Sequence, residues 1–228
     1  EKILLNMAKA GCDLIEIGIP FSDPIAEGPT IQSANVRALS KGVTTDDVFL
    51  LLEKISSKID VPLVIMTYLN VLFKYDYDNF FENCKKSGVS GVIVPDLPYE
   101  EKHEVSDVAS KYGVATISLI APTSESRIKM IAKEAEGFVY LVSSLGVTGV
   151  RSEIKTDLES IVEAIRVVTD IPCAIGFGIS TPEQAQKFSN EADGVIVGSA
   201  IVKIVEQYGK DAPEKVFDYV KSMKDAIR

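Results

Sequence analysis

The sequence predicts an α/β barrel in which parallel strands alternate with helices. Seven strand-like runs occur along the 228 residues, and amphipathic helical stretches separate them. This alternation is typical of βαβ units around a parallel sheet. The strand-like runs are apolar and rich in β-branched residues, as expected for a sheet that is covered on both faces. A (β/α)8 TIM barrel has about 250 residues, so the chain has nearly the length of one barrel.

The expected elements follow one another in a regular order. A helical pattern over residues 3–8 comes first and ends at Gly11. Strands are expected at residues 13–19, 63–68, 91–94, 115–120, 138–142, 174–177 and 194–197. Helices are expected at residues 45–57, 77–86, 101–111, 124–135, 157–168, 182–188, 199–208 and 212–228. The alternative fold, a doubly wound open sheet, would need a G-x-G-x-x-G turn after the first strand, and the sequence has none there.

The count of strands adds a further expectation about the barrel. Seven strands are found where the barrel needs eight, and no strand, capping residue or initiator Met precedes the first helical pattern. We therefore expect residues 1–228 to form a single TIM-barrel domain that is incomplete at its N-terminus. Its first strand is expected upstream of Glu1.

Composition excludes several classes of protein. Apolar residues make up 46% of the chain and no apolar run reaches the roughly 18 residues of a membrane helix, so neither disorder nor a membrane partner is expected. The 24 Lys and Arg against 33 Asp and Glu give a net charge of −9, which disfavours nucleic acid as a partner. Cys12, Cys84 and Cys173 are far apart and form no C-x-x-C pair, as is typical of reduced thiols in a cytoplasmic protein. The single histidine, His103, lies in a charged stretch and excludes a Ser-His-Asp triad or a histidine-based metal site, so no metal is expected.

The first strand carries a candidate acid–base residue. Side chains alternate along a strand, so Leu14, Glu16 and Gly18 share one face and three isoleucines share the other. Glu16 is then expected to point into the barrel, near the carboxyl end of its strand, where such barrels place their active sites. A carboxyl group among apolar neighbours has a raised pKa, which suits a group that both donates and accepts protons. The alternative is a structural glutamate paired with a cation elsewhere in the chain.

The loop after this strand is long and carries two acids. Residues 20–30 exceed the usual length of a strand-to-helix connection, and long loops in compact domains are often functional. Asp23 and Glu27 are each candidates to accept a hydrogen bond from an N–H group of a ligand. The alternative is an acid that caps the local backbone, and for Asp23 the two roles are left open.

Glycines after the last two strands indicate an anion site. Residues 176–180 (GFGIS) follow one strand, and Gly198 with Ser199 follows the next and opens a helix. Glycines allow backbone N–H groups to approach an anion, and the start of a helix adds partial positive charge. These two loops are where such barrels commonly bind phosphate. Simple turns are the alternative.

Two further segments remain candidates. The fourteen residues 143–156 (SSLGVTGVRSEIKT) form a long glycine-containing loop that is expected either to be a lid that excludes water or to be a disordered surface loop. Asp96 follows another strand and is expected either to face the pocket or to cap the next helix.

Taken together, these motifs resemble one known family. The chain is similar to the α subunits of tryptophan synthase over essentially all 228 residues, and the most specific stretches are LIEIGIPFSDPIAEG (14–28), YLVSSLGVTG (140–149), GFGIS (176–180) and GSAIVK (198–203). The resemblance implies a (β/α)8 barrel that cleaves indole-3-glycerol phosphate to indole and glyceraldehyde 3-phosphate. It implies no cofactor in this subunit, and a β subunit that carries pyridoxal phosphate and receives the indole, in an α2β2 assembly.

The resemblance also assigns roles to particular residues. Glu16 matches the catalytic acid/base, and Tyr140 matches a tyrosine beside it. Glu27 stands where most members have a second catalytic carboxylate, an aspartate that binds the indole N–H. Ser144 stands where well-known members have an arginine. The remaining matches are Thr148 in the lid, Gly149, Gly178, Gly198 and Ser199 at the phosphate, and Met66, Ile93, Leu119, Phe177 and Ile196 around the indole.

Cleavage of a bond at indole C3 requires a proton on that carbon and a base for the glycerol hydroxyl. One carboxylate can move both protons while a second stabilises positive charge near the indole nitrogen. Two alternatives remain: another phosphate-binding TIM-barrel enzyme, or a barrel subunit that mainly activates its partner. A Schiff-base aldolase is disfavoured because the strands contain no lysine.

Overall fold

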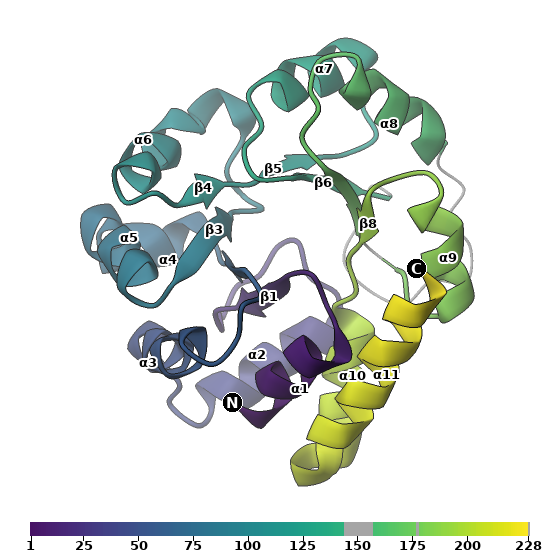
Figure 1. Ribbon diagram of the computed structural model, residues 1–228. Helices are drawn as coiled ribbons and strands as arrows, with labels where there is room; N and C mark the ends of the chain where they lie inside the picture. Colours follow the sequence, from purple (N-terminus) through teal and green to yellow (C-terminus); the bar gives the residue numbers. More distant parts are fainter. Residues whose placement is uncertain (144–156, 177, 228) are drawn as a thin grey trace.

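The protein is a barrel of parallel strands inside a ring of helices (Figure 1). The computed structural model describes residues 1–143, 157–176 and 178–227. Its strands pair in chain order, always in parallel, in two four-stranded sheets. The first sheet contains β1 (Ile15–Gly18), β2 (Leu63–Met66), β3 (Val89–Ile93) and β4 (Ala115–Thr116). The second contains β5 (Ser118–Ile120), β6 (Val139–Val142), β7 (Cys173–Gly176) and β8 (Gly194–Val195).

The two sheets are joined by one continuous run of chain. Only Ile117 separates β4 from β5, and its N–H donates to the carbonyl of Val92 at 2.9 Å. Because β4 pairs with β3 and β5 pairs with β6, residues 115–120 occupy a single position in the barrel. The described residues therefore fill seven barrel positions at the places the sequence predicts. The strands are mostly shorter than expected, and the last one ends at Val195 instead of residue 197.

Helices surround the strands. They are α1 (Lys2–Ala10), α2 (Pro29–Leu39), α3 (Thr45–Ser56), α4 (Leu69–Tyr75), α5 (Tyr77–Lys86), α6 (His103–Lys111), α7 (Glu125–Lys133), α8 (Leu158–Arg166), α9 (Pro182–Ser189), α10 (Ser199–Tyr208) and α11 (Ala212–Ala226), with 3-10 turns at Tyr99–Glu101 and Gly209–Asp211. The first helix ends as predicted, because Gly11 adopts a left-handed conformation with φ 92°. No helix in the described part of the chain is long and apolar enough to cross a membrane.

Two helices are absent from the expected set. The α2 helix begins with Gly28 as its N-cap and Pro29 in its first turn, a start signal inside the stretch that the sequence predicts to be a loop. It contains no buried residue, so its apolar pattern is weak. The α4 helix has only seven residues and follows β2 almost directly, so it is too short to show a clear helical period.

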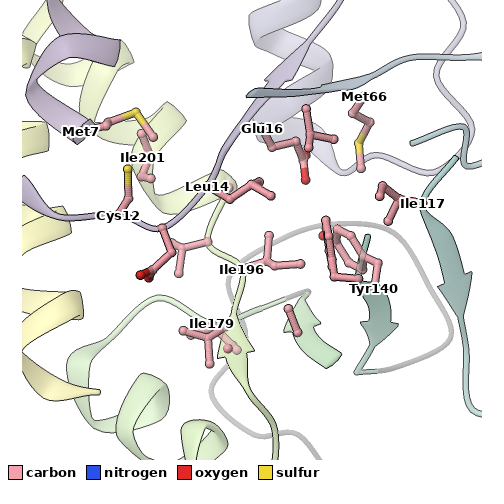
Figure 2. Close-up of a pocket in the computed structure, with 18 of the residues that line it drawn as sticks. Met7, Cys12, Leu14, Glu16, Met66, Ile117, Tyr140, Ile179, Ile196 and Ile201 are labelled. Carbon is pink, nitrogen blue, oxygen red and sulfur yellow. The ribbon is translucent and has the colours of Figure 1, made fainter. Parts of the chain in front are cut away.

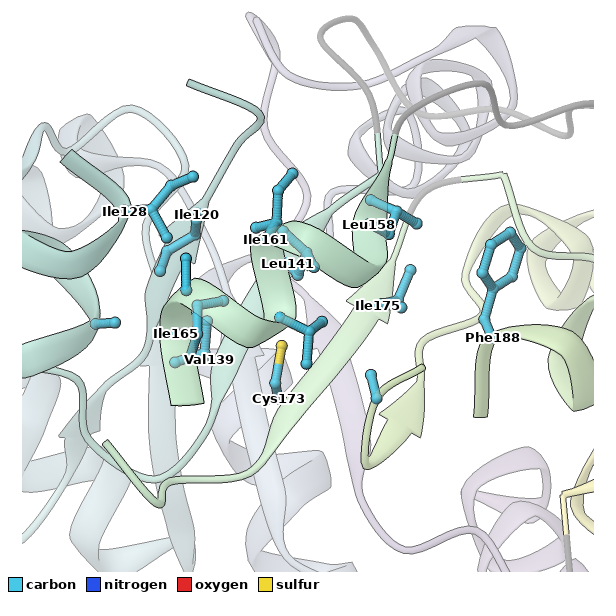
Figure 3. Close-up of a cluster of buried hydrophobic side chains, with 14 of the residues drawn as sticks. Ile120, Ile128, Val139, Leu141, Leu158, Ile161, Ile165, Cys173, Ile175 and Phe188 are labelled. Carbon is cyan, nitrogen blue, oxygen red and sulfur yellow. The ribbon is translucent and has the colours of Figure 1, made fainter. Parts of the chain in front are cut away.

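Alternation along the strands separates an outer core from the barrel interior. In β6, Val139 and Leu141 are fully buried against α7 and α8, where they pack with Ile165 (Figure 3). The side chains between them point the other way, and Tyr140 joins Val64 and other residues in a cluster inside the barrel. This period of two is the one expected of strands.

The ring has one place where the described strands do not pair. Strand β1 pairs with β2, and β8 pairs with β7, but no ladder joins β8 to β1 in the part of the chain that the structure describes. Helices α1, α10 and α11 lie together on this side of the barrel (Figure 1). An ion pair of 2.6 Å from Lys224 on α11 to Asp13 ties α11 to the segment that enters β1.

Candidate active site

A cavity of about 870 Å³ occupies the barrel interior. Glu16, Met66, Ile117, Tyr140 and Ile196 come from five different segments and point toward a common space (Figure 2). The wall is mainly apolar, and Glu16 and Glu27 are among the four acidic residues that line it, with Asp13 and Asp193. Apolar pockets with a few convergent polar groups are the usual form of an active site.

Glu16 reaches the cavity because of its register in β1. Ile15, its neighbour, is fully buried against the outer helices, so the Glu16 side chain faces inward as the alternation predicts. Burial, and then the charge of Glu27, raise the pKa of Glu16 to about 7. No cation among the described residues lowers this pKa, which disfavours the role of a structural glutamate in an ion pair. Glu16 therefore retains its proton close to neutral pH and is able to donate it.

Glu27 lies at the end of the loop between β1 and α2, and its residue is only 8% exposed. Its Oε2 accepts a hydrogen bond of 2.9 Å from Nδ2 of Asn35 on α2. Burial raises the pKa of Glu27, while hydrogen bonds from Asn35 and Tyr68 lower it. Asp23, the other acid of the loop, is exposed and accepts a hydrogen bond from the adjacent Ser22 hydroxyl, as a local turn residue does.

Tyr140 stands inside the barrel on β6 and is only 5% exposed. Burial and the nearby charge of Glu16 raise the pKa of its hydroxyl well above the ordinary value, so the hydroxyl keeps its proton. Gly176 on β7 gives the ring its space, because a Cβ at this position would lie 2.4 Å from Cε1 and 2.6 Å from the hydroxyl oxygen of Tyr140. No larger residue fits at position 176 without moving the tyrosine.

Three of the predicted phosphate residues line the same cavity. Gly178 has a φ of 90°, which favours glycine, and Gly198 is the N-cap residue of α10. The first turn of α10, which opens at Ser199, contains no acidic residue, so its N–H groups and helix dipole are unopposed by charge there. The hydroxyl of Tyr219 on α11 donates to the carbonyl of Ser180 at 2.8 Å and holds the loop that contains Gly178.

The other predicted residues take different positions. Met66 and Ile196 line the cavity, whereas Ile93 and Leu119 belong to the same interior cluster without lining its wall. Thr148, Gly149 and Phe177, like Ser144, lie outside the described residues.

Several neighbours of the site were not among the residues singled out from the sequence. Asn35 and Tyr68 contact Glu27 from α2 and from the end of β2. Asp96 neither caps the next helix nor lines this cavity, since its Oδ1 accepts from the N–H of Leu69 at the start of α4. An asparagine eight residues after a loop acid gives no recognisable local signal. Among the residues described, no group of three potential metal ligands comes together.

A barrel whose cavity holds carboxyl groups of raised pKa, with an uncapped helix start after the last described strand, is typical of TIM-barrel enzymes that act by acid–base chemistry. A family model described as tryptophan synthase alpha chain matches residues 1–228. The chain belongs to this family, whose members are lyases that cleave indole-3-glycerol phosphate and work with a beta subunit.

Individual relatives agree with this assignment. The tryptophan synthase alpha chain of Lacticaseibacillus casei is 48% identical over 226 residues, which are 99% of this chain and 85% of the relative. Among solved structures, the alpha chain from Legionella pneumophila subsp. pneumophila has a TM-score of 0.87 at 36% identity and covers 99% of this chain and 84% of that one. A structure of the a2b2 complex from Pyrococcus furiosus, described in terms of mutual activation, has a TM-score of 0.87 at 35% identity over 98% of this chain and 92% of that one.

Proposed function

We propose that Glu16, Glu27 and Tyr140 form the catalytic centre that cleaves indole-3-glycerol phosphate in this chain. The observation that supports this most is the pair of carboxyl groups in one apolar cavity. Glu16 keeps its proton to a pH of about 7, whereas two hydrogen bonds favour the ionised form of Glu27. Neighbouring carboxyl groups whose pKa values are separated by their surroundings commonly divide the roles of acid and charge stabiliser.

The protons then balance around Glu16. Protonated Glu16 donates to C3 of the indole, which becomes an indolenine, and the resulting carboxylate accepts the proton of the glycerol hydroxyl next to the bond that breaks. The electron pair of the carbon–carbon bond returns to the ring, the hydroxyl carbon becomes the aldehyde, and Glu16 is protonated again. Ionised Glu27 accepts a hydrogen bond from the indole N–H and stabilises the positive charge on the ring while C3 is protonated.

The rest of the cavity orients the substrate. The backbone N–H groups near Gly178, Gly198 and Ser199 bind the phosphate, and Met66 and Ile196 contact the indole, with Ile93 and Leu119 behind them. Tyr140 packs beside Glu16. The resemblance to the family extends this proposal to Gly149 at the phosphate, Phe177 at the indole and Thr148 in a lid.

Substitution of Glu16 by Gln tests the proposal. Gln has nearly the same shape but cannot transfer protons, so the rate of indole release is expected to fall about 100-fold or more. The matched control is Glu53→Gln, on the exposed surface of α3, which should keep the wild-type rate. A wild-type rate in Glu16→Gln contradicts the assignment. If the wild-type chain shows no turnover with or without a beta subunit, a partner-activating role replaces the catalytic one.

We further propose that a beta subunit binds at the carboxyl ends of the first strands, in an α2β2 assembly. Two exposed apolar side chains, Ile25 after β1 and Phe73 on α4, lie on segments that follow these strand ends, and each is 72% exposed. Phe73 also borders a surface pocket of about 360 Å³ whose rim includes Asp96 and Glu104. The family's alpha subunits need no cofactor of their own, and pyridoxal phosphate belongs to the beta subunit. The three free cysteines support a cytoplasmic location for the assembly.

An eighth strand between β8 and β1 completes the proposed active barrel. Both facing strand edges lack a partner in the described residues, and the cavity extends between them to Leu14 and Val195. A strand at this position would pair with both edges and close the apolar wall.

A further inference from the structure

The carboxylate of Glu27 accepts hydrogen bonds from two residues, Asn35 and Tyr68, that have no proton-transfer role in the proposed reaction. Asn35, on the second turn of α2, donates from Nδ2 to Oε2 of Glu27 at 2.9 Å. Tyr68 lies directly after β2 and is 2% exposed. Its hydroxyl oxygen accepts a hydrogen bond of 3.1 Å from the N–H of Ala26, and the hydroxyl also hydrogen-bonds the Glu27 side chain. The main chain of the same residue is held separately, because Gln32 Nε2 donates to the carbonyl of Glu27 at 2.7 Å.

We propose that Asn35 is a positioning residue for the cleavage reaction, whose amide fixes the side-chain conformation of Glu27 at the wall of the cavity shared with Glu16. This inference rests on the function proposed above and adds to it a residue that acts through Glu27. Asn35 also borders the cavity, from the side of α2, so the contact is made where the carboxylate enters the site.

The choice of an amide has a physical reason. A glutamate has several rotatable side-chain bonds, and without a partner its carboxylate would sample several positions, at a cost in free energy when the substrate requires one of them. The Asn35 amide donates a hydrogen bond to a charged acceptor, which is stronger than a bond between neutral groups. Because the amide is neutral, it leaves the negative charge of Glu27 available for the indole N–H. A lysine or arginine at position 35 would compensate that charge.

The titration of Glu27 provides a measurement specific to its hydrogen bond with Asn35. The titratable groups that face Glu27 from the described elements are Glu16 on β1 and Tyr68 after β2, with Tyr140 on β6 beside Glu16. Burial raises the pKa of Glu27, and the hydrogen bonds from Asn35 and Tyr68 oppose this effect. Loss of the Asn35 donor should therefore raise the pKa of Glu27 further, by about one pH unit for a hydrogen bond of ordinary strength to a charged group.

The test compares Asn35→Leu and Asn35→Asp with wild type in the full chain bound to a beta subunit. The first variant removes the donor at similar size, and the second places a like charge beside Glu27. We expect the acid limb of kcat/KM for indole-3-glycerol phosphate to move upward by about one pH unit in Asn35→Leu and further in Asn35→Asp, with a fall of up to about tenfold in kcat/KM on the acid side of the profile. The carboxyl carbon of Glu27, followed by 13C NMR, should show the same shift in its titration midpoint.

Two control variants on α2 separate positioning from packing. Ser33→Ala alters an exposed side chain, and Gln32→Ala removes only the bond to the Glu27 main chain. Neither should move the midpoint. An unchanged midpoint in Asn35→Leu and Asn35→Asp, or an equal shift in Gln32→Ala, overturns the proposal. The NMR titration needs no substrate: a shifted midpoint in a chain that releases no indole contradicts the proposed function, whereas normal indole release with an unshifted midpoint contradicts only the role of Asn35.

Discussion

Glu16 and Glu27 are the same residue type but have different surroundings, and the proposed division of roles between them depends on this difference. Glu16 projects from a strand among apolar side chains, so burial dominates its pKa. Glu27 projects from a loop within reach of two hydrogen-bond donors, and these oppose the effect of burial. At the scale of residues, burial raises the pKa of both carboxyl groups, and only that of Glu27 is opposed by hydrogen bonds.

The raised pKa of Glu16 predicts a pH-dependent cost in stability. The pKa of Glu16 rises from 4.5 to about 7 on folding, so the contribution of Glu16 to stability is fully present below pH 4.5 and is lost as pH rises toward 7. Glu16→Gln removes this cost. The variant should match the wild type at pH 4 and exceed its free energy of unfolding by up to about 3 kcal/mol at pH 8. Urea denaturation at both pH values measures this, and a difference that does not change with pH contradicts it.

Gly176 makes a second prediction at the residue scale. Gly176→Ala places a methyl group against the ring of Tyr140, so the ring must move, with a loss of about 1–3 kcal/mol in stability and at least tenfold in kcat. Thermal melting and the indole-release assay measure the two effects. The control is Gly18→Ala in β1, where a Cβ would meet no atom within 4 Å and the melting temperature should change little. Equal melting temperatures in the two variants would show that Tyr140 has room to adjust.

At the scale of elements, each helix covers the barrel through one apolar stripe. The α8 helix buries Ile161 and Ile165 against the outward side chains of β6 and β7 (Figure 3). Val167, just after this helix, is 71% exposed. The stripe, and not the overall hydrophobicity of the segment, therefore determines which of these residues stabilises the fold.

Two substitutions test whether burial in the apolar stripe decides stability, because each shortens a β-branched aliphatic side chain to alanine. Ile165→Ala should lower the free energy of unfolding by about 2–5 kcal/mol, because it removes buried methyl groups and leaves a cavity. Val167→Ala should change it by less than about 0.5 kcal/mol. Chemical denaturation of both variants gives the comparison, and similar losses in the two would mean that the stripe is placed wrongly.

At the scale of the whole molecule, the proposed partner surface and the proposed active site lie at the same end of the barrel, where the strands have their carboxyl ends. Glu27, Ile25 and α4 all follow the carboxyl ends of β1 and β2, so a partner that contacts Phe73 is also close to the loop that carries Glu27. The contact between Asp96 and the N–H of Leu69 fixes the start of α4 on this surface.

This arrangement predicts the effect of one surface substitution on assembly. Phe73→Ala should weaken binding to a beta subunit by about tenfold or more, because exposed aromatic side chains that become buried often dominate an interface. Val167→Ala, at a similarly exposed position just after α8, should bind as the wild type does. Isothermal titration calorimetry measures both affinities. Equal affinities for Phe73→Ala and the wild type would place the partner on another surface.

Much of the fold could be predicted from the sequence because it depends on local patterns. The period of two in β1 correctly placed Ile15 outward and Glu16 inward, and Gly11 correctly marked the end of α1. The order of the strands followed from their alternation with helices. The signals for α2 and α4 were too weak or too short to be recognised in the same way.

The contacts around Glu27 depend instead on tertiary structure. Its interaction with Tyr68 joins residues 41 positions apart in sequence, and the space for Tyr140 depends on a glycine in another strand. The sequence by itself determined the barrel class, the inward carboxyl of Glu16 and the family, because strand period and motif spacing are local properties of the chain. Only the tertiary structure decided that Asn35 and Tyr68 hold Glu27 and that Gly176 admits Tyr140, because hydrogen bonds and steric fit depend on distances that closure of the sheet creates.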